Sequence, residues 1–277
     1  MQIELIGCTS AGKSTLTRGI LQACHQQGLD IFLGDDFVLT QVRLNWIKSH
    51  LPRTLLVDLA ALVACLVTWR SHLEFYRFAT RLLFQLPIPR LERLNLLRNV
   101  LKKIGIHEII RSRSTDRQVI LVDEGVLQAA HNLFVHGSVQ VKAEHLATFA
   151  RLIPFPDVVV YLKEPESLLI DRTMKRGHKR IPDCSYSNVV RFIQQAVATF
   201  DKLVQNPAVE SKLLVVYGGQ YVTMAANNQD DPITGLALQI IRSGFTRDTT
   251  DTPTETTLSP GLHPIPTSLN SLLEKGS

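Results

Sequence analysis

Residues 7–14, near the amino terminus, have the order that is typical of a phosphate-binding loop. They read G-C-T-S-A-G-K-S and directly follow an apolar run, the context that this pattern requires. Gly7 and Gly12 allow the backbone to curl so that successive amide groups point at an anion. Lys13 adds a positive charge for the outer phosphates, and the Ser14 hydroxyl can hold Mg²⁺. The pattern predicts binding of a nucleoside triphosphate with magnesium.

We assign the whole loop to the nucleotide. ATP is the default ligand because the sequence contains no Asn-Lys-x-Asp guanine signature. Lys13 is also expected to be catalytic, since it would contact the transferred phosphate. The predicted nucleotide-binding residues are Gly7, Cys8, Thr9, Ser10, Ala11, Gly12, Lys13, Ser14 and Thr15.

Two carboxylates follow the apolar run at residues 119–122. Asp123 and Glu124 end this run, which has the composition of a strand buried on both faces. The carboxyl end of such a strand borders the ligand crevice of an α/β sheet. We therefore predict a magnesium site formed by Ser14, Asp123 and Glu124. Glu124 has two alternative roles, activating water in an ATPase or orienting a substrate.

A second pair of carboxylates, Asp35 and Asp36, follows the run at residues 31–33. A carboxylate at this strand end can accept the proton of an attacking hydroxyl, the task of a general base in phosphoryl transfer. Either residue could be the base. The structural alternative is that the pair caps the next helix.

Cations crowd into residues 171–180, which read D-R-T-M-K-R-G-H-K-R. Arg172 and Arg176 are four residues apart and share one helix face, and Gly177 then frees the chain. Phosphoryl transfer gains from cations that close over the transferring group. We predict a mobile lid at residues 172–184 with Arg172 and Arg176 as catalytic cations; the alternative is a solvated basic turn.

Strand and helix patterns alternate along the chain, which predicts a three-layer α/β/α fold with a mostly parallel five-stranded sheet. The expected strands are 2–6, 30–33, 118–122, 157–162 and 212–217. The expected helices are 12–26, 125–134, 142–152, 165–176, 185–205 and 232–242. Residues 40–116 form a helical insertion in the domain 1–244, and residues 245–277, rich in Thr, Ser and Pro, are expected to be disordered.

Composition points to a globular protein of the cytoplasm. Of the 277 residues, 45% are hydrophobic, and the four cysteines form no C-x-x-C pair. No secretory signal is visible, since a strand and the loop come first. The apolar run at residues 54–69 contains Asp58 and is short for a membrane span, so we favour a buried helix over membrane-surface contact.

Charge is unevenly distributed. Residues 43–118 hold 14 Lys or Arg against 5 Asp or Glu, a net of +9, whereas the rest of the chain has a net of −4. This excess favours an anionic small-molecule acceptor. No nucleic-acid partner is expected, because no such motif is present. An apolar insertion helix could also form a homodimer face.

Together these residues resemble the P-loop nucleoside and nucleotide kinases, over residues 1 to about 244. The loop, the V-D-E strand end and the stretch Y-L-K-E-P-E-S-L-L-I-D-R-T-M-K-R-G are similar to thymidylate kinase; the Asp35-Asp36 turn is more like uridine kinase. The resemblance implies an ATP–Mg-dependent phosphotransferase, with Asp35 as the base and Arg172 or Arg176 as lid cations. Glu124 stands where thymidylate kinase has an arginine that holds the acceptor phosphate.

Two rival functions remain open at this point. One is an ATPase or nucleotide-dependent switch, with Glu124 activating water and the insertion binding a protein or membrane partner. The other is a degenerate kinase that binds nucleotide without turnover.

Overall fold

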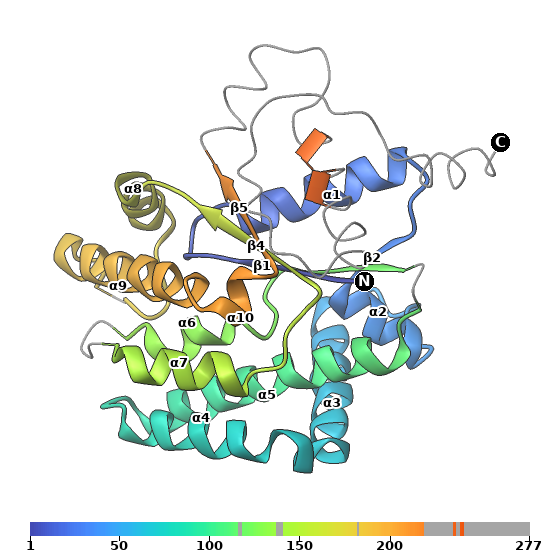
Figure 1. Cartoon of the computed structure of the whole chain (residues 1–277), viewed down its shortest axis with the longest axis horizontal. Helices are drawn as coiled ribbons and strands as arrows, with labels where there is room; N and C mark the ends of the chain where they lie inside the picture. Colours follow the sequence, from blue (N-terminus) through green and yellow to red (C-terminus); the bar gives the residue numbers. More distant parts are fainter. Residues whose placement is uncertain (116–117, 137–140, 182, 219–234, 237–238, 241–277) are drawn as a thin grey trace.

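A five-stranded parallel sheet with the strand order β2-β3-β1-β4-β5 forms the centre of the computed structural model (Figure 1). The structure describes residues 1–115, 118–136, 141–181, 183–218, 235–236 and 239–240. β1 lies in the middle of the sheet, and its Ile3 is in register with Leu121 of β3 and Val158 of β4. The strands are β1 Gln2–Ile6, β2 Ile31–Leu33, β3 Val119–Val122, β4 Val158–Lys163 and β5 Leu213–Tyr217.

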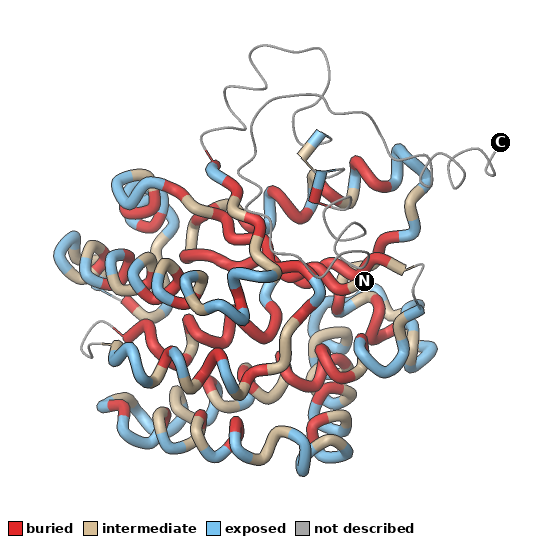
Figure 2. The backbone as a smooth tube through the Cα atoms, viewed as in Figure 1, coloured by how far each residue is buried: buried red, intermediate tan, exposed pale blue. Residues whose placement is uncertain are grey.

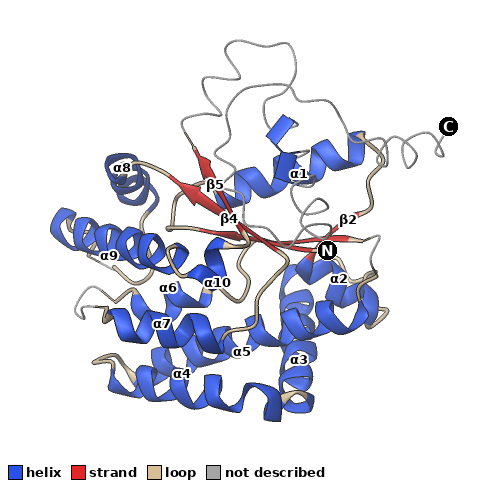
Figure 3. Cartoon of the chain, viewed as in Figure 1, coloured by secondary structure: helices blue, strands red, loops and turns tan. Residues whose placement is uncertain are grey.

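The sheet is buried on both faces, as its short apolar strands require (Figure 2). Helix α1, Lys13–Gln26, lies on one face, whereas α5, Arg90–Arg113, and α6, Ala129–Phe134, lie on the other (Figure 3). Side chains that alternate along β1 enter different clusters, with Ile3 and Leu5 on the α1 side and Ile6 on the α6 side. The three-layer P-loop α/β/α fold predicted from the sequence is therefore confirmed.

Most predicted elements occur within one or two residues of their expected ends. α7, Ala143–Leu152, α8, Glu166–Arg176, and α9, Tyr186–Val204, follow the expected pattern. Two helices were not predicted, α2 at Gly34–Gln41 and the short α10 at Pro207–Glu210. The predicted helix 232–242 lies mostly outside the described residues, and the predicted disordered tail lies wholly outside them.

The insertion consists of helices that lie below the sheet in Figure 1. It contains α3 His50–Val67, the 3-10 turn η1 Trp69–His72, α4 Leu73–Gln85 and the long α5. α3 and α5 pack closely because Gly105 of α5 has no side chain; a Cβ there would collide with the carbonyl oxygen of Ala61. Asp58 of α3 adds ion pairs to Arg98 at 3.3 Å and Lys102 at 3.1 Å.

The expectation that α3 is buried is wrong. Only Val57, Ala61 and Cys65 of this helix are buried, because α3 stands at the edge of the molecule and meets α5 along one stripe (Figure 1). It is the one helix in the described part of the chain that is long and apolar enough to cross a membrane, with a mean hydropathy of 1.7 and 17% of the segment buried.

Replacing Gly105 by alanine should destabilise the insertion, because the added methyl group must push α3 and α5 apart. Overpacking of this kind costs about 1–3 kcal/mol of unfolding free energy. Urea unfolding followed by circular dichroism measures the loss. Gly235→Ala is the matched control, because a Cβ at Gly235 meets no atom of the described residues within 4 Å. Equal stability of the two variants would contradict the close packing of α3 on α5.

Candidate nucleotide-binding cleft

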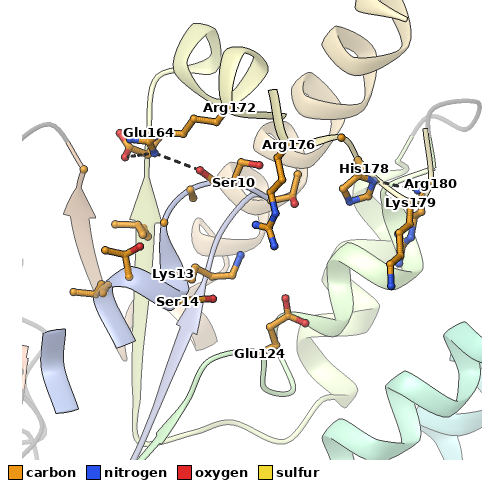
Figure 4. Close-up of a pocket in the computed structure, with 18 of the residues that line it drawn as sticks. Ser10, Lys13, Ser14, Glu124, Glu164, Arg172, Arg176, His178, Lys179 and Arg180 are labelled. Atoms are coloured by element: carbon orange, nitrogen blue, oxygen red, sulfur yellow. Dashed lines mark hydrogen bonds and ion pairs between the residues drawn. The ribbon is translucent and has the colours of Figure 1, made fainter. Parts of the chain in front are cut away.

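A cleft of about 1420 Å³ opens at the carboxyl end of the sheet, beside the phosphate loop (Figure 4). The loop and the start of α1 form its floor, and the end of α8 and the segment after it form one wall. The first half of α5 forms part of the opposite side. Among its lining residues are Thr9 to Thr15, Arg172, Arg176, Arg180, Glu124, Glu164, Glu92, Asn95 and Asn99.

The phosphate loop curls around the ammonium group of Lys13. Its Nζ donates hydrogen bonds to the carbonyl oxygens of Gly7 at 3.1 Å and Cys8 at 3.0 Å. Burial lowers the pKa of Lys13, since a charged amine is poorly solvated there. Gly7 has φ 145°, and a Cβ on it would lie 2.7 Å from the carbonyl oxygen of Leu162 in β4. Only glycine therefore allows the loop to pass this close to β4.

Gln128, in the turn between β3 and α6, clamps the start of the loop. The Gly7 amide donates to its Oε1 at 3.1 Å, and its Nε2 donates back to the Gly7 carbonyl oxygen at 3.0 Å. The Gln128 backbone amide in turn donates to Oε1 of Glu4, in β1, at 2.9 Å. Sequence reasoning missed both residues. Glu4 carried one sequence signal, a lone acid inside an apolar strand.

Glu4 is fully buried, and burial raises its pKa to about 7. Backbone amides of residues 126–128 and the charge of Lys103 oppose this rise. Gly125 packs directly on the carboxyl group, because a Cβ there would lie 2.5 Å from the Glu4 Cδ. The turn after β3 is thus fixed to the middle strand of the sheet.

Ser14 and Asp123 meet beside the loop, as predicted. The Ser14 hydroxyl donates to Oδ2 of Asp123 at 3.0 Å, and the other carboxylate oxygen, Oδ1, is buried without a hydrogen-bond partner. The described residues contain no group of three or more His, Cys, Asp or Glu that could hold a metal ion by itself. A hydroxyl and one carboxylate suit Mg²⁺, which takes most remaining ligands from phosphates and water.

Glu124 lines the cleft and is held by Lys103, which sequence reasoning also missed. The Lys103 Nζ, on α5, donates to the Glu124 backbone carbonyl at 2.6 Å and lies 3.6 Å from Oε2. The charge of Lys103 is the main cause that lowers the pKa of Glu124, against burial, and Lys13 and Arg180 act in the same direction. Glu124 is therefore an ionised carboxylate that faces the loop.

The predicted lid arginines both line the cleft. Arg172 donates to Oε1 of Glu164 at 3.0 Å and to the Ser10 carbonyl oxygen at 3.3 Å, so it ties α8 to the loop. Arg176 points into the space between Lys13 and Glu124 (Figure 4).

Arg180 is a third arginine of this wall, and the site residues predicted from the sequence did not include it. It donates to Oδ1 of Asn132 at 2.8 Å and to the carbonyl oxygens of His131 and Val135 at 3.3 Å. Burial lowers its pKa. The proposed lid segment thus supplies three arginines to this side of the cleft.

The structure does not bring Asp35 and Asp36 into the lining of the cleft. α2 begins at Gly34, so both carboxylates lie in the first turn of a helix, where its dipole favours negative charge. Asp36 pairs with Arg53 of α3, and Asp35 lies 3.7 Å from Lys102 of α5. The start of α2 has no side-chain cap hydrogen bond in the described part of the chain, so the capping alternative is not borne out, and a base at Asp35 or Asp36 stays a prediction.

The parallel sheet, its flanking helices and the loop define a three-layer α/β/α fold of the P-loop type. No family model matches the sequence, and no curated protein matches it. Among solved structures, the chain is similar to deoxyadenosine kinase from M. mycoides with the products dCMP and a flexible dCDP bound, at 14% identity and a TM-score of 0.43. A second structure of deoxyadenosine kinase from M. mycoides, with dCTP bound, has 14% identity and a TM-score of 0.39. Each match covers 88% of this chain and 100% of the other.

The buried Glu4 should make stability fall as pH rises. Its folded pKa of about 7 exceeds the ordinary value of 4.5, so the folded state holds the proton more tightly. The stabilisation is complete below pH 4.5 and is lost as pH rises through 7, by roughly 3 kcal/mol. Urea unfolding of wild type and Glu4→Gln at pH 5 and 8 measures this loss. The unfolding free energy of wild type, minus that of Glu4→Gln, should be larger at pH 5 than at pH 8. A constant difference would contradict a neutral buried Glu4.

Proposed function

We propose that this protein is an ATP–Mg²⁺-dependent phosphotransferase that moves the γ-phosphoryl group to a hydroxyl of a small acceptor. One observation carries the proposal. The buried Lys13 loop, the guanidinium of Arg176 and the ionised carboxylate of Glu124 converge on one cleft. Cations on two sides of a phosphate and a carboxylate opposite them are the groups that phosphoryl transfer requires.

The donor half of the site would hold ATP. The loop amides and Lys13 bind the phosphates, and Ser14 and Asp123 hold the magnesium ion, which neutralises charge on the phosphate oxygens. Arg176 stabilises the charge that spreads over the transferred phosphoryl group. Arg172 does the same after it has released Glu164. Because this reaction needs little covalent help from the protein, positioning and electrostatics supply most of the catalysis.

The acceptor half would lie along α5. Glu92, Asn95 and Asn99 of this helix line the same cleft as Glu124. Carboxylates and carboxamides bind hydroxyl and amino groups, whereas a phosphate would be repelled by Glu92 and Glu124. None of the lining residues is an arginine of the insertion. The excess positive charge of the insertion is therefore no argument for an anionic acceptor. We therefore propose a neutral acceptor that is rich in hydroxyl groups.

Glu124 is the proposed general base. It lines the cleft and its lowered pKa keeps it ionised, so it can accept the proton of the attacking hydroxyl. Asp35, the base expected from the sequence, has its carboxylate near Lys102 in the first turn of α2. The same position of Glu124 would also suit water activation, so an ATPase is the second candidate function.

Product analysis with γ-labelled ATP and panels of nucleosides and sugars tests the proposal. Lys13→Met should abolish transfer. Glu124→Gln should lower kcat at least 100-fold with little change in ATP affinity, because proton transfer typically contributes 10²–10⁴-fold. Asp35→Asn is the matched control and should stay within about threefold of wild type. Loss of transfer in Asp35→Asn alone would exclude Glu124 as the base, and hydrolysis that no acceptor stimulates would favour the ATPase.

Removing the Lys103 charge should move the pH dependence of transfer. The pKa of Glu124 is lowered mainly by Lys103, so in Lys103→Met it must rise toward its ordinary value. The acid limb of the kcat/KM profile should then shift to higher pH, because the base is ionised only above its pKa. Lys102→Met, the neighbour that pairs with Asp58 and Asp35, serves as the control. An unmoved acid limb would contradict the coupling of Lys103 to Glu124.

A further inference from the structure

The outward face of α3 is apolar along its whole length. Seven aliphatic side chains of this helix are exposed, by 44–80% of their area: Leu51, Leu55, Leu59, Leu62, Val63, Leu66 and Val67. The helix has 18 residues, which corresponds to a length of about 27 Å. The exposed aliphatic side chains follow one another along the whole helix, and a contiguous exposed apolar surface of this kind marks an interaction site.

The leucines on this face have the spacing of a coiled-coil seam. Leu55, Leu59, Leu62 and Leu66 are separated by four, three and four residues, the alternation of the a and d positions of a heptad. Such a seam accepts leucines of another helix as knobs between its own side chains. The same spacing read in the opposite direction is again four, three and four, so the seam is complementary to itself.

We infer that this face is covered by the same face of a second copy of the chain, with the two α3 helices antiparallel. A twofold axis at the middle of the seam places Leu59 opposite the partner's Leu62 and Leu55 opposite the partner's Leu66. Beyond the end of α3 at Val67, Leu51 approaches the partner's turn η1, which contains the exposed Arg70. A hollow of about 420 Å³ lies at the carboxyl end of α3 and can receive the partner's Leu51. It is lined by Leu66, Val67, Trp69 and Arg70.

Charge beside the seam favours a second copy over a lipid surface. Within His50–Val67, all of which the structure describes, no exposed side chain is Lys or Arg. Three cations on the flanks have acidic partners, because Arg53 pairs with Asp36, and Arg98 and Lys102 pair with Asp58; Arg70, at the end of the face, is exposed. Helices that lie on membranes instead carry free Lys and Arg along the polar face, which attract anionic lipid. An uncharged seam meets its own copy without repulsion.

The composition of this α3 face also suits a dimer. Stable interfaces between proteins bury about 800 Å² on each partner, with an apolar core and a polar rim. Seven largely exposed aliphatic side chains, with Trp69 and Arg70 at one end, provide such a core and part of its rim. The inference is independent of the proposed phosphotransferase activity, since α3 contributes no residue to the lining of the cleft.

Sedimentation equilibrium of the full chain at micromolar concentration tests the inference. Wild type should have twice the mass of the chain. Leu59→Glu should be monomeric, because the two carboxylates would be buried close together across the axis. Leu62→Ala, which adds no charge, should raise the dimer dissociation constant at least tenfold. Leu91→Glu, at an exposed leucine of α5, is the control and should remain dimeric.

Crosslinking tests the antiparallel register. When chains carrying Leu59→Cys are mixed with chains carrying Leu62→Cys, oxidation should join the two kinds, and wild type should give no such product. A monomeric wild type would overturn the inference. So would a dimer that Leu59→Glu and Leu62→Ala leave intact, or a monomer whose α3 face binds vesicles of anionic phospholipid and loses that binding in Leu59→Glu.

Discussion

A buried ammonium group determines how the site is built. Lys13 is 8% exposed, and within the described part of the chain its Nζ donates to two backbone carbonyls alone. Desolvation of a charge is costly, so the surroundings must supply compensating groups. Asp123 and Glu124 supply negative charge, and Gln128 fixes the Gly7 carbonyl to which the ammonium donates. A polyanion that enters the cleft would supply further negative charge around the buried ammonium group. This is the physical basis for assigning phosphate to the loop.

The sequence predicted those parts of the fold that depend on local pattern. The five strands are short apolar runs, and the loop is a contiguous motif, so both could be recognised without tertiary information. Glu4, Gln128 and Lys103 could not, because each acts through a partner distant in sequence; the Gln128 and Gly7 positions are 121 residues apart. One expectation, the buried α3, was wrong for a related reason, and a second, Asp35 or Asp36 as the base, is not supported by the lining of the cleft. Apolar composition does not show which side of α3 is covered, and Asp35 with Asp36 fits a helix start as well as a catalytic turn.

Five of the fourteen Lys and Arg residues in the basic segment 43–118 have ion-pair partners among the described residues. Arg53, Arg98 and Lys102 pair with Asp36 and Asp58. Glu108 of α5 is nearly buried, and although burial alone would raise its pKa, hydrogen bonds from His72 and Arg111 lower it to about 2. These pairs hold the helices of the insertion together. The net charge of a segment therefore describes its surface only where the charges are free, and it says little about the cleft that the segment borders.

α5 connects the two surfaces to which we assign a role. Its first half faces the cleft through Asn95 and Asn99, its Lys103 holds the backbone and carboxylate of Glu124, and its Gly105 receives α3 in close contact. Closely packed helices move together, because a core at crystal-like density does not deform locally. Covering the outer face of α3 would therefore restrain α5 and, through Lys103, the position of Glu124. On this argument the insertion is a second wall of the site, whose rigidity depends on what covers its far side.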